Sequence, residues 1–385
     1  MRLTLMIICT LALLLSITRG KAQRFDAPPL ALDGPYAVGT IERTITDEER
    51  PLTLTVWYPS NGENAPLQYP FVPPFSVDGF GSRDAEPVQD VAPFPLVIFS
   101  HGSGGSRVLS LFLTEHLASQ GFVVMAADHP GNGAQETVLG QQDFATNYAL
   151  RPDDILRQID YAADVLNVDE GFLAGKIDME RVGVIGHSFG GWTALAASGG
   201  RLDFTQLDDY CDQVSEDNNV CFVAPLKDEI AAIRGLDTTP QGPWNATTDT
   251  RIKAVIALAP WNAPLLNVNA VAIPSMIIVG SEDTTTPAER DADVFYAQLP
   301  APRSLVTLEL GGHYLFVDEC PDVLLRFGAQ DVCTDPVWDM TRAHDIIRHM
   351  TTAFMRQYLM NDDEAASYLA PESINFTGVR YQTDG

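Results

Sequence analysis

From Pro95 onward, short runs of apolar residues alternate with longer amphipathic segments. The apolar runs are rich in Val, Ile and Ala, which is typical of strands that are buried on both faces. The alternation therefore predicts a mostly parallel, doubly wound α/β sheet with helices on both of its faces. The predicted strands are 95–100, 122–127, 182–186, 254–259, 275–280 and 304–310, and the predicted helices are 108–119, 151–166, 288–299 and 344–360.

The residues before Pro95 follow a different pattern. The runs 36–45 and 52–58 are rich in β-formers and flank a polar turn, so they predict a hairpin and bring the sheet to eight strands. Residues 59–94 are dense in Pro, Gly and Asn, which predicts a long irregular connection. Because aromatic residues occur in this connection, we expect it to lie against the body of a single domain, 23–385.

Residues 201–250 interrupt the alternation with a polar stretch that carries two cysteines. The stretch falls at the edge of the sheet where parallel strands end and where ligands bind in open α/β sheets. We therefore expect a lid or cap insertion over the site, and the alternative is a surface excursion away from it. Its acidic residues lack the glycine and the spacing of a calcium loop, so no metal or other cofactor is predicted.

The chain has 385 residues and a formal net charge of −27. A protein that binds nucleic acid needs Lys and Arg to neutralise phosphates, so this charge argues against nucleic-acid partners. Residues 1–22 combine Arg2, an apolar run and a small-residue end at Gly20-Lys21-Ala22, which predicts a secretory signal. An uncleaved anchor is the alternative. No later run is long enough to span a bilayer, so we expect a secreted or periplasmic protein without stable membrane insertion.

Four cysteines remain after the signal segment. An even number in an exported chain predicts two disulfides, and pairing of sequence neighbours gives Cys211–Cys221 and Cys320–Cys333. Free thiols are the alternative. No Cys-x-x-Cys pair or nearby His indicates a metal site instead.

The stretch Gly186-His187-Ser188-Phe189-Gly190 fits the G-x-S-x-G pattern of a nucleophile elbow. In such an elbow one serine sits in a strained conformation between a buried strand and a helix. The residues two before and two after the serine must be small, because the strand and the helix nearly touch there. The apolar strand before Ser188 and the small-residue helix after it support this interpretation over an incidental glycine turn.

A serine nucleophile needs a base and an acid. His313 follows the last predicted strand after two glycines, whereas the other histidines lie in helices, inside the elbow or before it. Asp283 follows the strand before that one, and it would hold the His313 imidazole in the correct tautomer. The neighbouring Glu282 is the less favoured acid.

The oxyanion hole requires two backbone N–H groups. The first predicted donor is Phe189, directly after the nucleophile. The second is Ser103, in the His101-Gly-Ser-Gly-Gly loop that follows strand 95–100. That loop lacks the lysine of a phosphate-binding loop. The candidate walls of an apolar substrate pocket are Trp192, Trp261, Tyr314 and Phe316, although each is also a candidate core residue.

These motifs resemble a branch of the α/β-hydrolases, the platelet-activating-factor-acetylhydrolase and dienelactone-hydrolase-like esterases. The resemblance covers about residues 34–360 and is carried by RPLTLTVWYPS, LVIFSHGSGG, AADHPGN, RPDDI and VGVIGHSFGG. It implies the α/β-hydrolase fold, with the chain order Ser, Asp, His, no cofactor, and hydrolysis of short-acyl esters. Dienelactone hydrolases use a cysteine where this chain has Ser188. The acetylhydrolases take their acid from the strand end where this chain has Ala259 and Pro260.

The sequence therefore predicts a serine ester hydrolase that forms an acyl-Ser188 intermediate. Its partner is a small-molecule or lipid ester, and the sequence says nothing about its oligomeric state. A lipase or polyester hydrolase acting on insoluble substrates is a second hypothesis. A non-enzymatic binding module is the third, but such a module has no reason to keep three triad residues. Asp128 and His129 precede the elbow, and we expect them to brace a loop.

Overall fold

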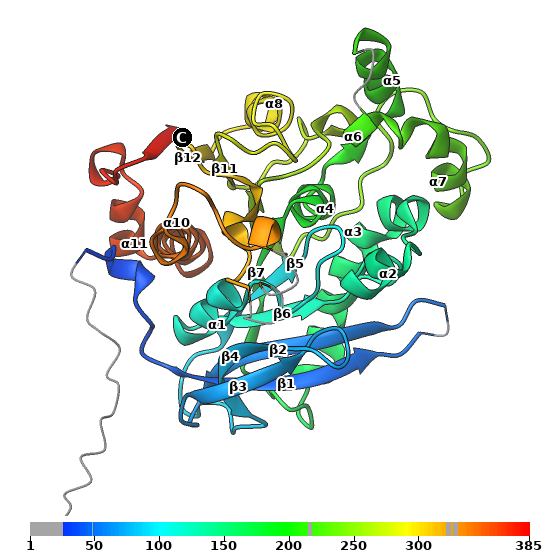
Figure 1. Ribbon diagram of the computed structural model, residues 1–385. Helices are drawn as coiled ribbons and strands as arrows, with labels where there is room; N and C mark the ends of the chain where they lie inside the picture. Colours follow the sequence, from blue (N-terminus) through cyan, green and yellow to red (C-terminus); the bar gives the residue numbers. More distant parts are fainter. Residues whose placement is uncertain (1–25, 48, 215–217, 321–324, 326–329) are drawn as a thin grey trace, which may run out of the picture.

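An eleven-stranded sheet runs through the residues that the computed structural model describes, which are 26–47, 49–214, 218–320, 325 and 330–385 (Figure 1). Its spatial order is β13-β12-β11-β9-β7-β5-β6-β2-β1-β4-β3. The strands are β1 (Ala37–Ile45), β2 (Leu52–Ser60), β3 (Ala65–Pro70), β4 (Ser76–Arg83), β5 (Phe94–Ser100), β6 (Val123–Ala127), β7 (Ile177–His187), β9 (Ile252–Leu258), β11 (Ser275–Gly280), β12 (Arg303–Leu308) and β13 (Val379–Asp384). The predicted signal segment, 1–22, lies outside the described residues.

The six central strands β12, β11, β9, β7, β5 and β6 are parallel to one another, whereas β13 pairs antiparallel with β12, β2 with β6, and β1 with β2. The predicted mostly parallel sheet is thus confirmed. The predicted number of eight strands is wrong by three among the described residues, because β3, β4 and β13 extend the two edges. These edge strands are short and largely exposed, so they lack the apolar runs that reveal a buried strand.

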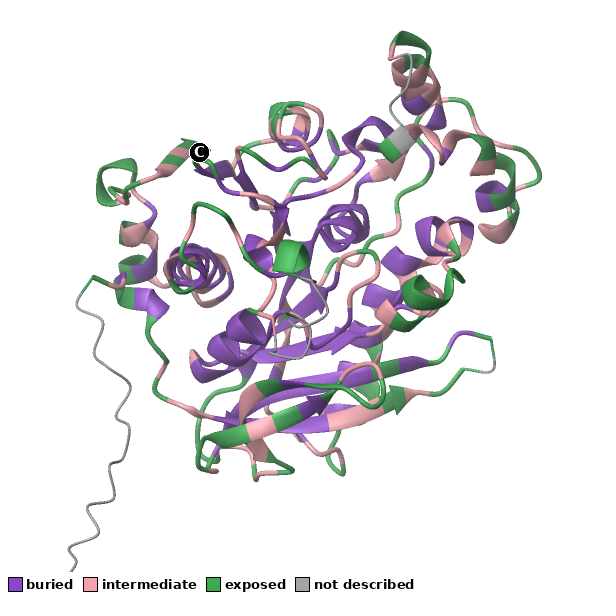
Figure 2. Cartoon of the chain, in the orientation of Figure 1, coloured by how far each residue is buried: buried purple, intermediate pink, exposed green. Residues whose placement is uncertain are grey.

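Helices cover both faces of the sheet and enclose two separate apolar clusters (Figures 1 and 2). Helices α3, α4 and α8 pack on one face, and α1, α10 and α11 pack on the other. The helices are α1 (Leu111–Ser119), α2 (Ala134–Leu139), α3 (Phe144–Tyr161), α4 (Phe189–Ala197), α5 (Phe204–Gln213), α6 (Asn218–Cys221), α7 (Lys227–Ile233), α8 (Ala292–Gln298), α10 (Met340–Met360) and α11 (Asp363–Tyr368). None of the described helices is long and apolar enough to cross a membrane.

The order of the central strands fixes where a ligand can bind. The chain runs from β5 to β6 on one side and then crosses to β7 on the other side of β5. In an open parallel sheet, a crevice forms at such a switch point, outside the carboxyl ends of the two diverging strands. Here those ends carry His101 after β5 and Ser188 after β7.

Residues 59–94 are not the irregular connection that their composition predicted. Within this stretch, residues 65–83 form the antiparallel hairpin of β3 and β4, which joins the sheet through two residue pairs between β4 and β1. The hairpin is also fastened to α1, because the Phe80 N–H donates to both carboxylate oxygens of Glu115, at 3.0 and 3.1 Å. Glu115 of α1 thus supplies hydrogen-bond acceptors to a part of β4 that does not pair with β1.

Helix α3 begins about two turns before the predicted start at Arg151. Asp143 caps its first turn by accepting a hydrogen bond from Thr146 N–H at 2.9 Å, and Pro152 lies inside the helix. The proline and the acidic residues that suggested a helix start therefore mark an interior turn. Helix α3 ends at Tyr161 and continues as a π-helical turn, Ala162–Leu166.

Both predicted disulfides are present. Cys211–Cys221 joins α5 to α6 with a Cα–Cα distance of 5.8 Å, and Cys320–Cys333 closes a loop beyond β12 with a Cα–Cα distance of 5.2 Å. The segment 201–250 holds α5, α6, α7 and the short strand β8 (Arg201–Leu202), which pairs with β10 (Leu266–Asn267) beyond the segment.

The Glu115 contact predicts a pH dependence of stability. Burial raises the pKa of Glu115 to about 8, although its hydrogen bonds with Tyr69 and Phe80 act to lower it. The folded state therefore keeps a proton that the unfolded state loses, so this contribution to stability is present at acid pH and is lost as the pH rises to about 8. Glu115→Gln should remove the effect, which we expect to be on the order of 2 kcal/mol. Urea unfolding of both proteins at pH 5 and pH 9 measures it, and a constant stability difference between them would contradict the assignment.

Candidate active site

Ser188 stands at the tip of a sharp turn between β7 and α4. Its backbone has φ 59° and ψ −120°, a strained conformation for a residue with a side chain. Neighbouring segments hold it there. Ser188 N–H donates to the Leu258 carbonyl of β9 at 2.8 Å, and the Ser188 carbonyl accepts from Trp261 N–H at 3.2 Å. The turn is thus fixed by the adjacent strand and not only by its own residues.

The glycines on either side of Ser188 are required by contact. A Cβ at Gly186 would overlap the Gly190 carbonyl, and a Cβ at Gly190 would overlap the Ser100 carbonyl at the end of β5. The strand, the helix and the adjacent strand end therefore meet with no room for a methyl group. This is the physical reason for the small residues that the G-x-S-x-G pattern predicted.

Asp283 and His313 form a buried pair. Asp283 Oδ2 lies 2.7 Å from His313 Nδ1, and only 3% of Asp283 and 6% of His313 are exposed. Because an ionised carboxylate only accepts, the imidazole proton lies on Nδ1 and leaves Nε2 free to act as a base. Each residue follows the end of a parallel strand, Asp283 after β11 and His313 after β12.

A second residue fixes the acid in place. Thr286 donates to both Asp283 oxygens, from its N–H at 2.7 Å and from its hydroxyl at 2.7 Å. Burial acts to raise the pKa of Asp283, but the hydrogen bonds and charge of His313 and the hydrogen bonds of Thr286 outweigh it, so the pKa lies below its ordinary value. Asp283 is therefore ionised at neutral pH, as a partner of an imidazolium must be. Sequence reasoning did not identify Thr286.

His187 holds the loop of His313 from the other side. Its Nε2 donates to the His313 carbonyl at 3.1 Å, and the two rings are 4.8 Å apart. Burial and the neighbouring His313 lower the pKa of His187 to about 3, so His187 stays neutral. It is a donor to the backbone and not a competing base.

The two predicted oxyanion donors lie at the ends of neighbouring strands. Phe189 N–H belongs to the first turn of α4, where N–H groups have no partner within the helix. In the part of the chain that the structure describes, Ser103 N–H makes no hydrogen bond, whereas Gly104 N–H donates to Asn132 and Gly105 N–H to Gly102. The Ser103 amide is therefore free of protein acceptors within the described residues, as an oxyanion donor must be.

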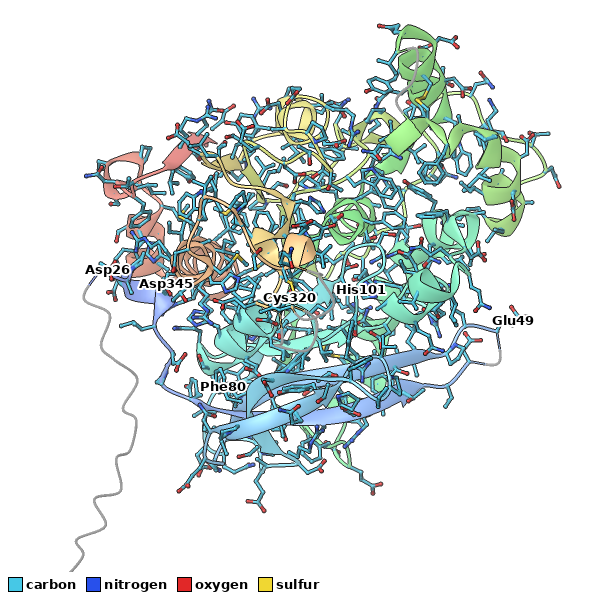
Figure 3. The ribbon with its side chains drawn as sticks, in the orientation of Figure 1. Asp26, Glu49, Phe80, His101, Cys320 and Asp345 are labelled. Carbon is cyan, nitrogen blue, oxygen red and sulfur yellow. A yellow bond between two sulfur atoms is a disulfide. The ribbon has the colours of Figure 1, made fainter. Side chains whose placement is uncertain are left out.

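A cavity of about 740 Å³ opens over these residues. His101 and Cys320, labelled near the centre of Figure 3, belong to two of its walls. The walls come from several regions of the chain that lie far apart in the sequence. Its lining includes Phe71, Val77 and Asp78 of the β3–β4 hairpin, 101–105 with Leu109 and Ser110, Ser188, Trp261, His313 with Tyr314 and Val317, and 318–320 with Val332 and Cys333.

Of the four residues predicted as pocket walls, two line the cavity. Trp261 and Tyr314 line the cavity. Trp192 and Phe316 do not line it, because both are fully buried in the core, in the apolar clusters on opposite faces of the sheet. Trp192 packs against Tyr148 and Phe189. An aromatic residue that is close to a site in sequence can belong either to the core or to the pocket wall, because the local backbone direction decides which way its ring points.

The alternative acidic residues lie outside the site. Glu282 is exposed, whereas Asp283 is buried. Asp128 and His129 are not partners of one another. Asp128 pairs with Arg107, and His129 Nδ1 lies 2.8 Å from Asp154. Among the described residues, no group of three His, Cys, Asp or Glu side chains is arranged to hold a metal ion.

The predicted lid contributes little of the cavity surface. Asn219 lines it, and Phe222 stacks on Trp261 with the ring centroids 6.0 Å apart. A larger share comes from residues on either side of the Cys320–Cys333 disulfide, a wall that sequence reasoning missed. The signal available in the sequence was the closeness of Cys320 to His313.

Comparisons with known proteins show a family match and more distant similarities. The family model described as the alpha/beta hydrolase family matches residues 97–327, more than half of the chain. The chain is 25% identical over 301 residues to Cutinase 2 of Thermobifida cellulosilytica, covering 77% of this chain and 80% of that protein. It is also 25% identical over 301 residues to Cutinase cut1 of Thermobifida fusca, covering 77% and 66%.

A further similarity covers a shorter region. Platelet-activating factor acetylhydrolase of Canis lupus familiaris is 29% identical over 147 residues, or 29% of this chain and 33% of that protein.

The elbow geometry predicts a difference between two glycine substitutions. Gly190→Ala should destabilise the fold by more than about 3 kcal/mol, because its methyl group would overlap the Ser100 carbonyl and force the strand end to move. Gly235→Ala should cost only about 1 kcal/mol, because Gly235 has a φ of 70° but no atom within 4 Å of the added Cβ. Equal losses in urea unfolding would show that the elbow tolerates a side chain.

Proposed function

The chain belongs to the alpha/beta hydrolase family, and from this premise we propose that it is a serine hydrolase of carboxylic esters. Ser188 is the nucleophile, His313 the base and Asp283 the acid, with Ser103 and Phe189 as oxyanion donors. The observation that carries the proposal is the buried Asp283–His313 pair, 2.7 Å apart, whose His313 lines the same cavity as the strained Ser188.

The reaction proceeds in two halves. Ser188 Oγ attacks the ester carbonyl carbon while His313 Nε2 takes its proton, and the developing oxyanion is held by the Ser103 and Phe189 N–H groups. The tetrahedral intermediate then collapses: the alkoxide leaves with the proton from His313, and the acyl group stays on Ser188. Water attacks this acyl ester, giving its proton to His313, and the second tetrahedral intermediate releases the acid and restores Ser188.

The charge around the cavity favours an uncharged ester. The charged residues among the described lining residues are Asp78, Asp318 and Glu319, and no Lys or Arg is among them. An anionic substrate would find no counter-ion there and would be repelled by these carboxylates. The cavity, at about 740 Å³, is also large enough for much more than an acetyl group.

Hydrolysis of insoluble esters is the second candidate function. It is favoured by the similarity to two proteins named cutinases over 77% of this chain. Hydrolysis of short-acyl esters is supported by the similarity to platelet-activating factor acetylhydrolase over 147 residues.

We further propose that residues 201–250 act as a lid and that the protein is exported. The contact of Phe222 with the cavity residue Trp261 supports the lid. The two disulfides and the similarity to cutinases support an extracellular or periplasmic location, because disulfides persist in oxidising compartments.

Three substitutions test the proposed triad. Ser188→Ala should abolish hydrolysis of p-nitrophenyl acetate, and Asp283→Asn should lower kcat by about 10³–10⁴-fold, because the wrong imidazole tautomer would face the serine. Glu282→Gln is the matched control, since this exposed neighbour should leave kcat unchanged. Near-wild-type turnover of Ser188→Ala, with folding checked by circular dichroism, would overturn the mechanism.

The two candidate functions differ in their response to the substrate's physical state. If the site is built for soluble esters, kcat/KM should be highest for one chain length of the p-nitrophenyl acyl series from acetate to dodecanoate, and polyester films should lose no mass. If insoluble esters are the substrates, activity should rise sharply once the ester forms an emulsion, and films should release acid in a manner that depends on Ser188.

A further inference from the structure

Arg151 of α3 is a buried cation without an ion pair. It is 0% exposed, and within the described ranges no carboxylate lies within 4.0 Å of its guanidinium. The acceptors of its hydrogen bonds are all neutral. Burying a charge without a counter-ion is costly, and such a charge is retained where other contacts compensate for it. We therefore expect the contacts of this guanidinium to serve a function.

One side of the guanidinium holds the loop of Ser103. Its Nη2 donates to the His101 carbonyl, and its Nη1 donates to Asn132 Oδ1 at 2.9 Å. Asn132 in turn donates from Nδ2 to Ser103 Oγ at 3.1 Å, and its carbonyl accepts from Gly104 N–H at 3.1 Å. Arg151 thus contacts the loop before Ser103 directly, and it contacts Ser103 and Gly104 through Asn132.

The face of the same guanidinium contacts the second donor. Its central carbon lies 4.6 Å from the centroid of the Phe189 ring, in a cation–π arrangement. Phe189 is itself fully buried. A single side chain therefore contacts both segments whose N–H groups form the proposed oxyanion hole.

A chain of hydrogen bonds connects the charge to a distant carboxylate. Arg151 Nη2 donates to Ser100 Oγ at 3.1 Å, Ser100 lies 3.0 Å from His129 Nε2, and His129 Nδ1 lies 2.8 Å from Asp154. Burial and the charge of Arg151 hold the pKa of His129 well below its ordinary value, so His129 is neutral. Because the Asp154 carboxylate only accepts, the His129 proton lies on Nδ1, and Nε2 accepts from the Ser100 hydroxyl. Asp154 also forms an ion pair with Arg50, in which Arg50 Nη2 lies 2.7 Å from Asp154 Oδ2.

The protonation states agree with this arrangement. Burial lowers the pKa of Arg151 to about 9, while Asp154 acts to raise it, so Arg151 is cationic at neutral pH. Burial and the charge of Arg151 lower the pKa of His101 to about 4. The two histidines beside Arg151 are therefore neutral, and the guanidinium is the source of positive charge beneath the loop.

We propose that Arg151 is a positioning residue for the oxyanion hole, which aligns the Ser103 and Phe189 N–H groups and keeps a positive charge behind them. The inference rests on the proposed function. Its effect is on the transition state, because the negative charge that these donors stabilise develops only there, in surroundings that exclude water. Its removal should therefore lower kcat and leave KM nearly unchanged.

The test compares Arg151→Gln with Arg50→Gln. Both remove a buried guanidinium from the same cluster, but Arg50 contacts Asp154, Asn147 and the Pro130 carbonyl and neither oxyanion segment. The readouts are kcat and KM for p-nitrophenyl acetate, the inhibition constant of a trifluoromethyl ketone, and the melting temperature. The ketone forms a tetrahedral Ser188 adduct whose oxygen occupies the oxyanion hole.

For Arg151→Gln we expect kcat to fall by about 10²-fold, and the ketone to bind more weakly by a similar factor, with KM within about threefold. For Arg50→Gln we expect a lower melting temperature but ketone binding within about threefold of wild type. Ketone binding that is unchanged in Arg151→Gln, or weakened equally in both variants, would overturn the positioning role.

Two milder substitutions decide the matter if Arg151→Gln does not fold. Asn132→Ala removes the link to Ser103, and Phe189→Leu removes the ring beneath the guanidinium but keeps the N–H group. Each should weaken ketone binding by about tenfold, and wild-type affinity in both would overturn the inference. Failure of the proposed function is distinguishable, because then Ser188→Ala would remain active and the ketone would not bind wild type through Ser188.

Discussion

The close contact of β7, α4 and the end of β5 is the constraint on which the rest of the site depends. Gly186 and Gly190 allow the Gly190 and Ser100 carbonyls to occupy the space of a side chain, and this contact forces Ser188 into its strained conformation. The strain is sustained because the β9 backbone holds Ser188 from the opposite side. With the tip of the turn fixed, the strand ends beside it supply the other groups at a set distance.

Those other groups are held by buried polar side chains, each of which donates in a defined direction. Thr286 orients Asp283, and His187 donates to the backbone of His313. Beneath the opposite loop, Arg151 and Asn132 perform the same role for Ser103. Burial keeps the two neighbouring histidines, His101 and His187, uncharged, so that they act as fixed hydrogen-bonding groups at neutral pH. A site of this kind is preorganised, and little reorganisation is needed when charge develops.

The cavity has a different origin. Its floor comes from the strand ends, but its walls come from segments outside the parallel sheet, which are the β3–β4 hairpin, the loop beside the Cys320–Cys333 disulfide and the edge of the 201–250 insertion. Loops and edge strands tolerate change more readily than the sheet does. In the proposed function, the substrate is therefore selected by the parts of the chain that are least constrained by the core, and the chemistry is carried by the parts that are most constrained.

The sequence by itself determined the parallel sheet, the elbow and the spacing of Ser188, Asp283 and His313, because buried strands and glycine contacts leave strong local patterns. It also determined the disulfide partners, since each pair closes a short loop. Only the tertiary structure decided that 59–94 form a hairpin, that Trp192 and Phe316 are core residues, and that Arg151 lies beneath the oxyanion loop. The exposed edge strands lack an apolar run, the direction of a ring follows from the backbone, and Arg151 finds its His101 acceptor 50 residues away, so no local pattern records these features.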